Sequence, residues 1–184
     1  MIKIQKFNQE KATEAASIFL KLHNGEMKYL LLVKLLYFLD REAFKRWERP
    51  VTFDSYASLP YGPVVSETLD IIRGKNKESG FWNNYIVTVP NKKIRLKDSP
   101  PKIKKLSPAE IGLISEIDAK FGSYDPFTLA KKMHDLPEYK DPGQSSIPIT
   151  LEDLLSAVGY NSEDIIRIIN EMQEEANTDL VFTV

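Results

Sequence analysis

The longest apolar stretch of the chain is Met27–Trp47, with the sequence MKYLLLVKLLYFLDREAFKRW. Nearly every residue of Tyr29–Leu39 is apolar, so a helix there would be hydrophobic on all sides, as helices at the centre of a fold are. Leucine favours helix, and apolar positions continue beyond Asp40 over a length too great for a strand. The pattern predicts a central buried helix over 27–47, ended by Pro50.

A membrane-spanning helix is the competing interpretation of this stretch. Met27–Leu39 holds only 13 residues and includes Lys34, whereas a bilayer needs roughly 20 apolar residues. The N-terminus MIKIQKFNQEK also lacks the apolar core of a signal peptide. We therefore expect a cytoplasmic protein.

Helical spacing and capping residues predict further helices on both sides of the central one. Ser107 and Glu110 form a capping-box pattern, and Asp125 stands where the next helix would begin. Gly62 followed by Pro63 predicts a helix whose first turn contains the proline, with backbone N–H groups that could hold an anion or simply a structural turn. The predicted helices are 11–22, 63–72, 107–121, 125–134, 151–158 and 162–176.

Alternating apolar and polar residues predict a few short strands. They fall at 2–7, which could instead be an ordered arm, and at 51–57, 85–89 and 94–96. The last two are expected to form a hairpin that shares one small sheet with 51–57, and 136–148 is predicted to be loop. The fold class is therefore mainly α with a small antiparallel sheet (α+β), in a single domain over 1–184.

Composition adds little to this picture, but charge is unevenly distributed. The net charge is −1, which gives the whole molecule no strong preference for nucleic acid. Residues 91–105 carry seven basic side chains against Asp98, whereas 151–184 carry eight acids against Arg167. Such runs are usually solvated surface, and the sharper interpretation is a basic contact patch and an acidic C-terminal arm.

The sequence offers few residues for catalysis, so we expect a protein that is not an enzyme and needs no cofactor or metal. It has no Cys and only two His, and it lacks the common metal, nucleophile and phosphate-binding motifs. Asp40 follows an apolar run and is expected to be paired with an Arg or a backbone donor. An enzyme would require Asp40 and His134 to meet in an open pocket. Tyr37, Tyr56 and Tyr61 are interpreted as packing residues with hydroxyl partners.

Nucleic-acid binding is the alternative function. The basic hairpin region 82–105 could follow phosphates, with Trp82 and Tyr85 available for base stacking. No helix-turn-helix spacing accompanies it.

Three segments together resemble a known family. Lys34–Asp40 reads KLLYFLD, Phe53–Ala57 reads FDSYA, and Tyr61–Val64 reads YGPV. In this combination they resemble the Panacea family of SocA-like and phage-associated GepA-type domains, in which a Lys-Leu-hydrophobic-Tyr helix precedes a strand and a Tyr-Gly-Pro helix start. Thr128–Ala130 with His134 resembles the later family segment. Leu136–Tyr139 departs from the expected Ala-Trp, so the match is looser there.

The resemblance covers about 12–139 and leaves 150–184 as a C-terminal helical extension. It implies an antitoxin of a type II toxin–antitoxin system, which neutralises a cognate protein toxin by direct binding, with family members paired to unrelated toxins. Lys34, Tyr37, Asp40, Tyr61, Gly62, Pro63 and His134 are then residues that hold the fold. Toxin contacts are expected from the 82–96 hairpin and the tail after Ser162, and the candidates are Trp82, Tyr85, Lys92, Lys93, Arg95 and Phe182.

Overall fold

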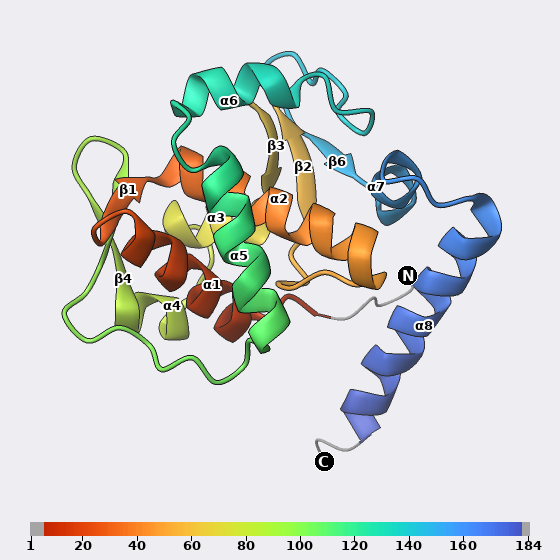
Figure 1. The fold of residues 1–184 in the computed structure, drawn as a ribbon, viewed down its shortest axis with the longest axis horizontal. Helices are drawn as coiled ribbons and strands as arrows, with labels where there is room; N and C mark the ends of the chain where they lie inside the picture. The colour runs from red at the N-terminus through yellow and green to blue at the C-terminus, as the bar shows by residue number, and fades with distance from the viewer. Residues whose placement is uncertain (1–5, 182–184) are drawn as a thin grey trace.

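A computed structural model describes residues 6–181 of the chain, and side chains for residues 6–178 (Figure 1). Helices account for most of this part, together with two small antiparallel sheets, which confirms the predicted fold class. In chain order the elements are α1 (Gln9–Leu22), β1 (Glu26–Lys28), α2 (Tyr29–Trp47), β2 (Tyr56–Leu59), β3 (Gly62–Val65), α3 (Ser66–Ile72), α4 (Gly80–Tyr85), β4 (Ile86–Val89), β5 (Lys93–Leu96), α5 (Pro108–Phe121), α6 (Pro126–Met133), β6 (Ile147–Ile149), α7 (Leu151–Ala157) and α8 (Ser162–Val181).

The central helix α2 is surrounded as its apolar sequence predicts. It packs against α1, α5, α6 and α7 and against strand β3, and its leucines from Leu32 to Leu39 are fully buried. The helix begins at Tyr29 because Met27 and Lys28 pair with β5 instead. It ends at Trp47, because the left-handed backbone of Glu48 stops it shortly before Pro50. Within the described residues, no helix has the length and apolarity that crossing a membrane requires.

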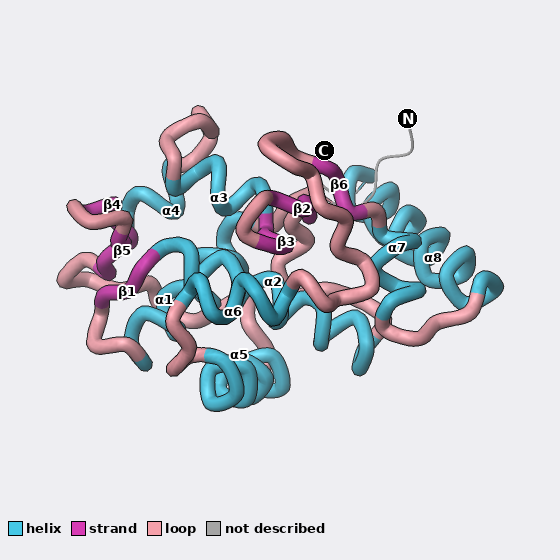
Figure 2. The backbone as a smooth tube through the Cα atoms, turned by 90° about the horizontal axis from the view of Figure 1, so that it is seen from above, coloured by secondary structure: helices cyan, strands magenta, loops and turns pink. Residues whose placement is uncertain are grey.

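The two sheets lie on different sides of α2 (Figures 1 and 2). The first has the strand order β1-β5-β4 and contains the predicted hairpin, whose turn places Asn91 and Lys92 in left-handed conformations. The second has the order β3-β2-β6. Pro63 and Pro148 lie on its two edge strands, where a residue without an N–H breaks no internal ladder.

Four predictions between residues 51 and 148 were wrong. The strand placed at 51–57 begins only at Tyr56, because the backbone N–H groups of Val51 and Thr52 bind a side chain of α2. Gly62–Val65 is a strand, and the helix predicted to start at Pro63 begins only at Ser66. The hairpin and β2 belong to separate sheets, because the hairpin strand β5 pairs with β1 and not with β2. The loop predicted over 136–148 also contains the start of β6.

Helices α5, α6 and α7 begin at the capping residues that the sequence predicts. Ser107 and Glu110 form the capping box of α5, and Asp125 and Thr150 cap α6 and α7. Helix α8 runs farther than predicted and lies along one end of the molecule beside α7 (Figure 2). The strand predicted at 2–7 falls mostly outside the described residues, and Lys6 and Phe7 are not in a strand. Phe182 also lies outside them.

Candidate partner-binding site

Asp40 is a buried structural anchor at the middle of α2. Its carboxylate accepts the backbone N–H groups of Val51 and Thr52, both at 2.9 Å, and the hydroxyl of Tyr56 at 2.9 Å. Burial raises the pKa of Asp40, and the hydrogen bonds from Thr52, Tyr56 and Val51 oppose that rise. Asp40 therefore fixes the chain that leads from α2 into β2, through backbone and hydroxyl donors.

One turn earlier, Tyr37 reaches the segment after α6. Its hydroxyl donates to Glu138 at 2.7 Å, and the Nε of Arg41 donates to the same carboxylate at 2.6 Å. The Glu138 side chain is fully buried. Its hydrogen bond with Tyr37 and its ion pair with Arg41 therefore hold the loop after α6 against the central helix. Burial and the Glu138 charge raise the pKa of the Tyr37 hydroxyl.

A further turn back, Lys34 supports the β2–β3 turn. Its side chain is fully buried and its Nζ donates to the backbone carbonyl of Tyr61. Desolvation lowers the pKa of Lys34 to about 7. Gly62 has a φ of +88°, and a Cβ there would lie 3.2 Å from the Lys34 Nζ and 3.3 Å from the Met133 Cβ. Glycine is thus required both by the backbone and by the close approach of α2 and α6.

This tight packing presents Tyr61 on the surface. The side chain is 57% exposed and meets Phe127 of α6, itself 48% exposed, edge to face at 5.6 Å. Tyr37 and Tyr56 have the hydroxyl partners predicted for them, but the Tyr61 hydroxyl donates to no described residue. Its interpretation as a packing residue was wrong, because the turn points the ring outward.

A groove of about 590 Å³ runs past these two rings, between the β2–β3 turn, the start of α6 and the tip of the β4–β5 hairpin. Val64 and Leu69 are buried beneath it, and Tyr29, Leu30, Leu59 and Pro60 add apolar walls. We call this surface the Tyr61 groove. Its lining residues are Lys28, Tyr29, Leu30, Leu59, Pro60, Tyr61, Val64, Leu69, Arg73, Asn91, Lys92, Pro126, Phe127, Gln144 and Ser145.

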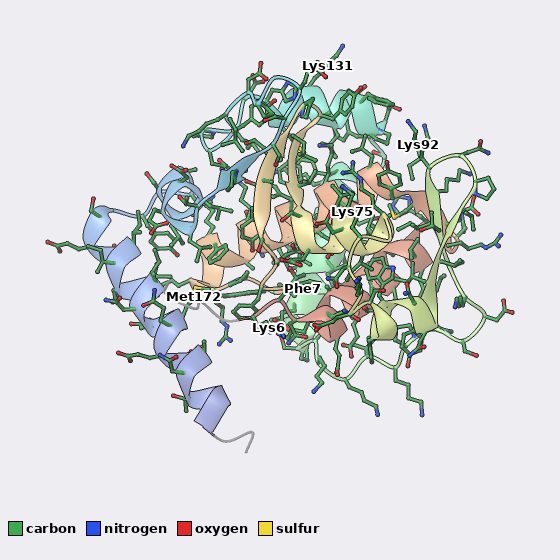
Figure 3. The ribbon with its side chains drawn as sticks, turned by 180° about the vertical axis from the view of Figure 1, so that it is seen from behind. Lys6, Phe7, Lys75, Lys92, Lys131 and Met172 are labelled. Atoms are coloured by element: carbon green, nitrogen blue, oxygen red, sulfur yellow. The ribbon has the colours of Figure 1, made fainter. Side chains whose placement is uncertain are left out.

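The charged residues of the Tyr61 groove are all basic. Lys28, Arg73 and Lys92 line it, with no Asp or Glu among the lining residues. All three are exposed, and none forms an ion pair with any side chain in residues 6–178. Figure 3 shows Lys92 projecting from the hairpin tip. The groove therefore combines an apolar floor, two exposed rings and uncompensated positive charge.

The other residues predicted to bind a partner are placed differently. Trp82 lies in α4 and is 2% exposed, so it belongs to the core. Tyr85 packs on the ring of Phe81. Lys93 and Arg95 share Glu26 on the neighbouring strand, at 2.8 and 3.9 Å. Of the hairpin candidates only Lys92 lines the groove.

The structure does not bring Asp40 and His134 into one pocket. Asp40 is fully buried with its oxygens occupied, whereas His134 is exposed at the end of α6 and stacks on Tyr139 at 4.6 Å. The other histidine, His23, pairs with Asp118 at 2.8 Å. Among the described residues, no three His, Asp or Glu side chains are placed to hold a metal ion.

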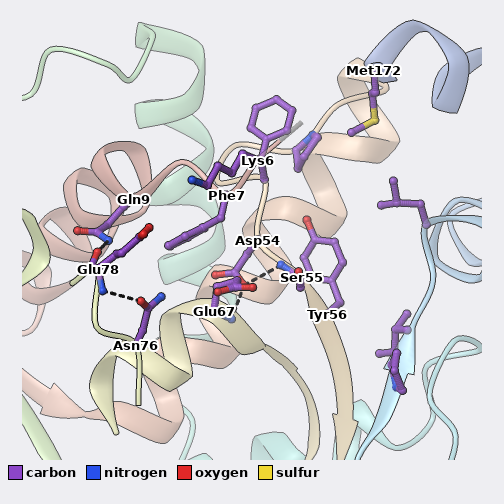
Figure 4. Close-up of a pocket in the computed structure, with 15 residues that line it drawn as sticks. Lys6, Phe7, Gln9, Asp54, Ser55, Tyr56, Glu67, Asn76, Glu78 and Met172 are labelled. Carbon is purple, nitrogen blue, oxygen red and sulfur yellow. Dashed lines mark hydrogen bonds between the residues drawn. The ribbon is translucent and has the colours of Figure 1, made fainter. Parts of the chain in front are cut away.

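A second cavity of about 720 Å³ shares no lining residue with the Tyr61 groove (Figure 4). Phe7 and Met172 contribute to its walls, together with Asp54. Asp54 accepts the N–H groups of Glu67 and Thr68 and so caps α3 from a distance. Burial raises the pKa of Asp54 to about 7, against these hydrogen bonds. Its carboxylate already serves the fold, so this cavity is a weaker candidate than the Tyr61 groove.

Comparison with known families adds a decisive observation. Residues 32–140, more than half of the chain, match the family described as "Antitoxin SocA-like, Panacea domain". The chain belongs to this family. No curated protein and no solved structure matches the chain significantly. The Panacea match includes Lys34, Tyr37, Asp40, Gly62 and the residues between them that build the Tyr61 turn.

The Panacea region also supplies most of the groove, including Tyr61, Arg73, Lys92 and Phe127, while Lys28 comes from just before it. Sequence reasoning missed Phe127 and Arg73. A signal existed for Phe127: with Asp125 as the cap of α6, the buried face of that helix is Leu129 and Met133. Phe127 therefore falls on the outer face, where a large aromatic residue is unusual.

Proposed function

We propose that this Panacea protein is the antitoxin of a type II toxin–antitoxin system and neutralises a cognate protein toxin by binding it directly. Membership of the antitoxin family over residues 32–140 carries the proposal. The Tyr61 groove supports it, because an exposed apolar surface bordered by charged residues is typical of protein interfaces.

The buried polar groups fit a scaffold. Asp40 accepts hydrogen bonds from the segment that follows α2, and Glu138 accepts them from Tyr37 and Arg41 of α2. Buried carboxylates whose hydrogen bonds are all formed fix the loops next to the central helix.

Coexpression tests the proposal. The gene next to the one encoding this chain is expressed from an inducible promoter, alone and together with the chain. We expect the neighbour to stop growth alone, growth to recover with the chain, and the two proteins to copurify. Unrelieved toxicity without a complex would refute the proposal.

A nucleic-acid-binding regulator that uses the basic region 82–105 is the alternative function. The burial of Trp82 and the sharing of Glu26 by Lys93 and Arg95 give it less support. It predicts retention of the purified chain on nucleic acid that weakens steeply with salt. Absence of retention at low salt would exclude this function.

A further inference from the structure

The Tyr61 groove has a chemistry that specifies its occupant more closely than the family does. Lys28, Arg73 and Lys92 stand around an apolar floor with no carboxylate in the lining. Some basic side chains elsewhere on the surface have acidic partners, as Lys93 has Glu26 and Arg167 has Glu48. Like charges gathered without counter-charges favour a negatively charged ligand.

The backbone that carries each of the two exposed rings of the groove is held in place by hydrogen bonds and close packing. Tyr61 leaves a turn whose carbonyl is bound by the buried Lys34 and whose Gly62 is packed against Met133. Phe127 leaves the first turn of α6, which Asp125 caps through the N–H groups of Phe127 and Thr128. Aromatic side chains that are already ordered lose little freedom on binding, which is a property of residues that dominate interface energies.

We propose that the Tyr61 groove is the docking site for a short acidic segment of the toxin. In this arrangement an apolar side chain of that segment lies on Val64 and Leu69 beside the Tyr61 and Phe127 rings. Carboxylates on either side of it pair with Lys28, Arg73 and Lys92. The proposal rests on the proposed toxin-binding function and adds the location of the contact and the charge of the partner.

The shape and lining of the groove favour a protein segment over nucleic acid. A surface that binds the phosphate backbone of a nucleic acid needs a continuous stripe of basic residues. In the Tyr61 groove, apolar residues such as Leu59 and Pro60 separate the basic side chains. The hairpin cations that would extend such a stripe, Lys93 and Arg95, face Glu26. A floor of Val64 and Leu69 suits an inserted aliphatic or aromatic side chain.

The test uses the full chain, the product of the neighbouring gene and two matched triple variants. One variant reverses the groove charges (K28E, R73E and K92E). The control reverses three lysines that are also exposed, form no ion pair in residues 6–178 and lie outside the groove. These are Lys21, Lys45 and Lys102. A third variant, Y61A with F127A, removes the rings. Circular dichroism and thermal unfolding establish that each variant is folded.

We expect the groove charge reversal to abolish growth rescue and copurification while the control triple retains both. The ring variant should bind the toxin about 30-fold more weakly or worse, the usual loss at a dominant interface residue. A toxin variant with Lys in place of the acidic residues of that segment should bind the chain with the charge-reversed groove. The same toxin variant should not bind the wild-type chain. Restoration of this kind would establish the acidic partner chemistry.

Failure of the docking site and failure of the function give different results. If the wild type neither rescues growth nor binds the toxin, the proposed function is wrong. If the wild type does both and the folded groove variants do so equally well, the docking site is wrong while the function stands. Loss of the complex after nuclease treatment, or self-association of the chain that the groove variants abolish, would also overturn the docking site.

Discussion

Lys34 gives the sharpest stability prediction, because a fully buried lysine with a lowered pKa makes stability depend on pH in a defined window. The folded pKa is about 7 against an ordinary value of 10.5. Between these values the unfolded chain binds more protons than the folded one, so the free energy of unfolding rises with pH. Lys34→Met removes this titration and keeps a side chain of similar length.

The magnitude follows from the two pKa values. Between pH 7 and pH 9 the contribution of Lys34 to the free energy of unfolding should increase by about 2 kcal/mol. All other titrating groups are common to the wild type and Lys34→Met, so they cancel in the difference between the two proteins. The wild type should therefore gain about 2 kcal/mol relative to the variant over this range.

Urea unfolding followed by circular dichroism at several pH values measures this difference. Lys45→Met is the matched control, because Lys45 lies on the same helix with its ammonium group in water. The control should run parallel to the wild type, while the Lys34→Met curve should diverge from both above pH 7. Parallel curves for all three proteins would show that Lys34 is not desolvated as the structure places it.

Three further substitutions test other parts of the scaffold. Asp40→Ala should lower the free energy of unfolding by about 3 kcal/mol, since it strands two backbone N–H groups and a tyrosine hydroxyl; an unchanged urea midpoint would refute its anchoring role. Gly62→Ala should cost about 1–3 kcal/mol in the same assay because of its left-handed backbone; a neutral result would contradict the described turn. Asp54→Ala should cost about 1–2 kcal/mol and speed hydrogen exchange at the Glu67 and Thr68 amides; unaltered exchange there would argue against distant capping.

Periodicity and capping residues in the sequence were enough to predict most helices. The apolar run in α2 and the caps of α5 and α6 depend on neighbours within a few residues. The β4–β5 hairpin was also predictable, since its turn residues stand between two alternating segments. In these places local and tertiary preferences agree.

Predictions failed where long-range contacts override local preference. Val51 and Thr52 have a strand-like pattern, but Asp40, eleven and twelve residues earlier, takes their N–H groups. Pro63 is common in first helical turns, yet pairing with Ser58 places it in an edge strand. Neither Asp40 nor Ser58 can be recognised as a partner from spacing alone.

The candidate site was predicted only in part. Tyr61 and Lys92 were singled out for separate reasons, and the sequence could not show that they line one groove. Lys28 and Arg73 were not singled out, because their lack of acidic partners is a property of the folded surface. Trp82 was selected as exposed, although its helix places it in the core.

The central claim, direct neutralisation of a protein toxin, is tested most directly by titration calorimetry of the purified chain against the purified product of the neighbouring gene. We predict saturable binding at one site per chain, abolished by the K28E, R73E and K92E triple variant and retained by the matched control triple. A folded, toxic neighbour that gives no binding signal with the wild-type chain would contradict the claim.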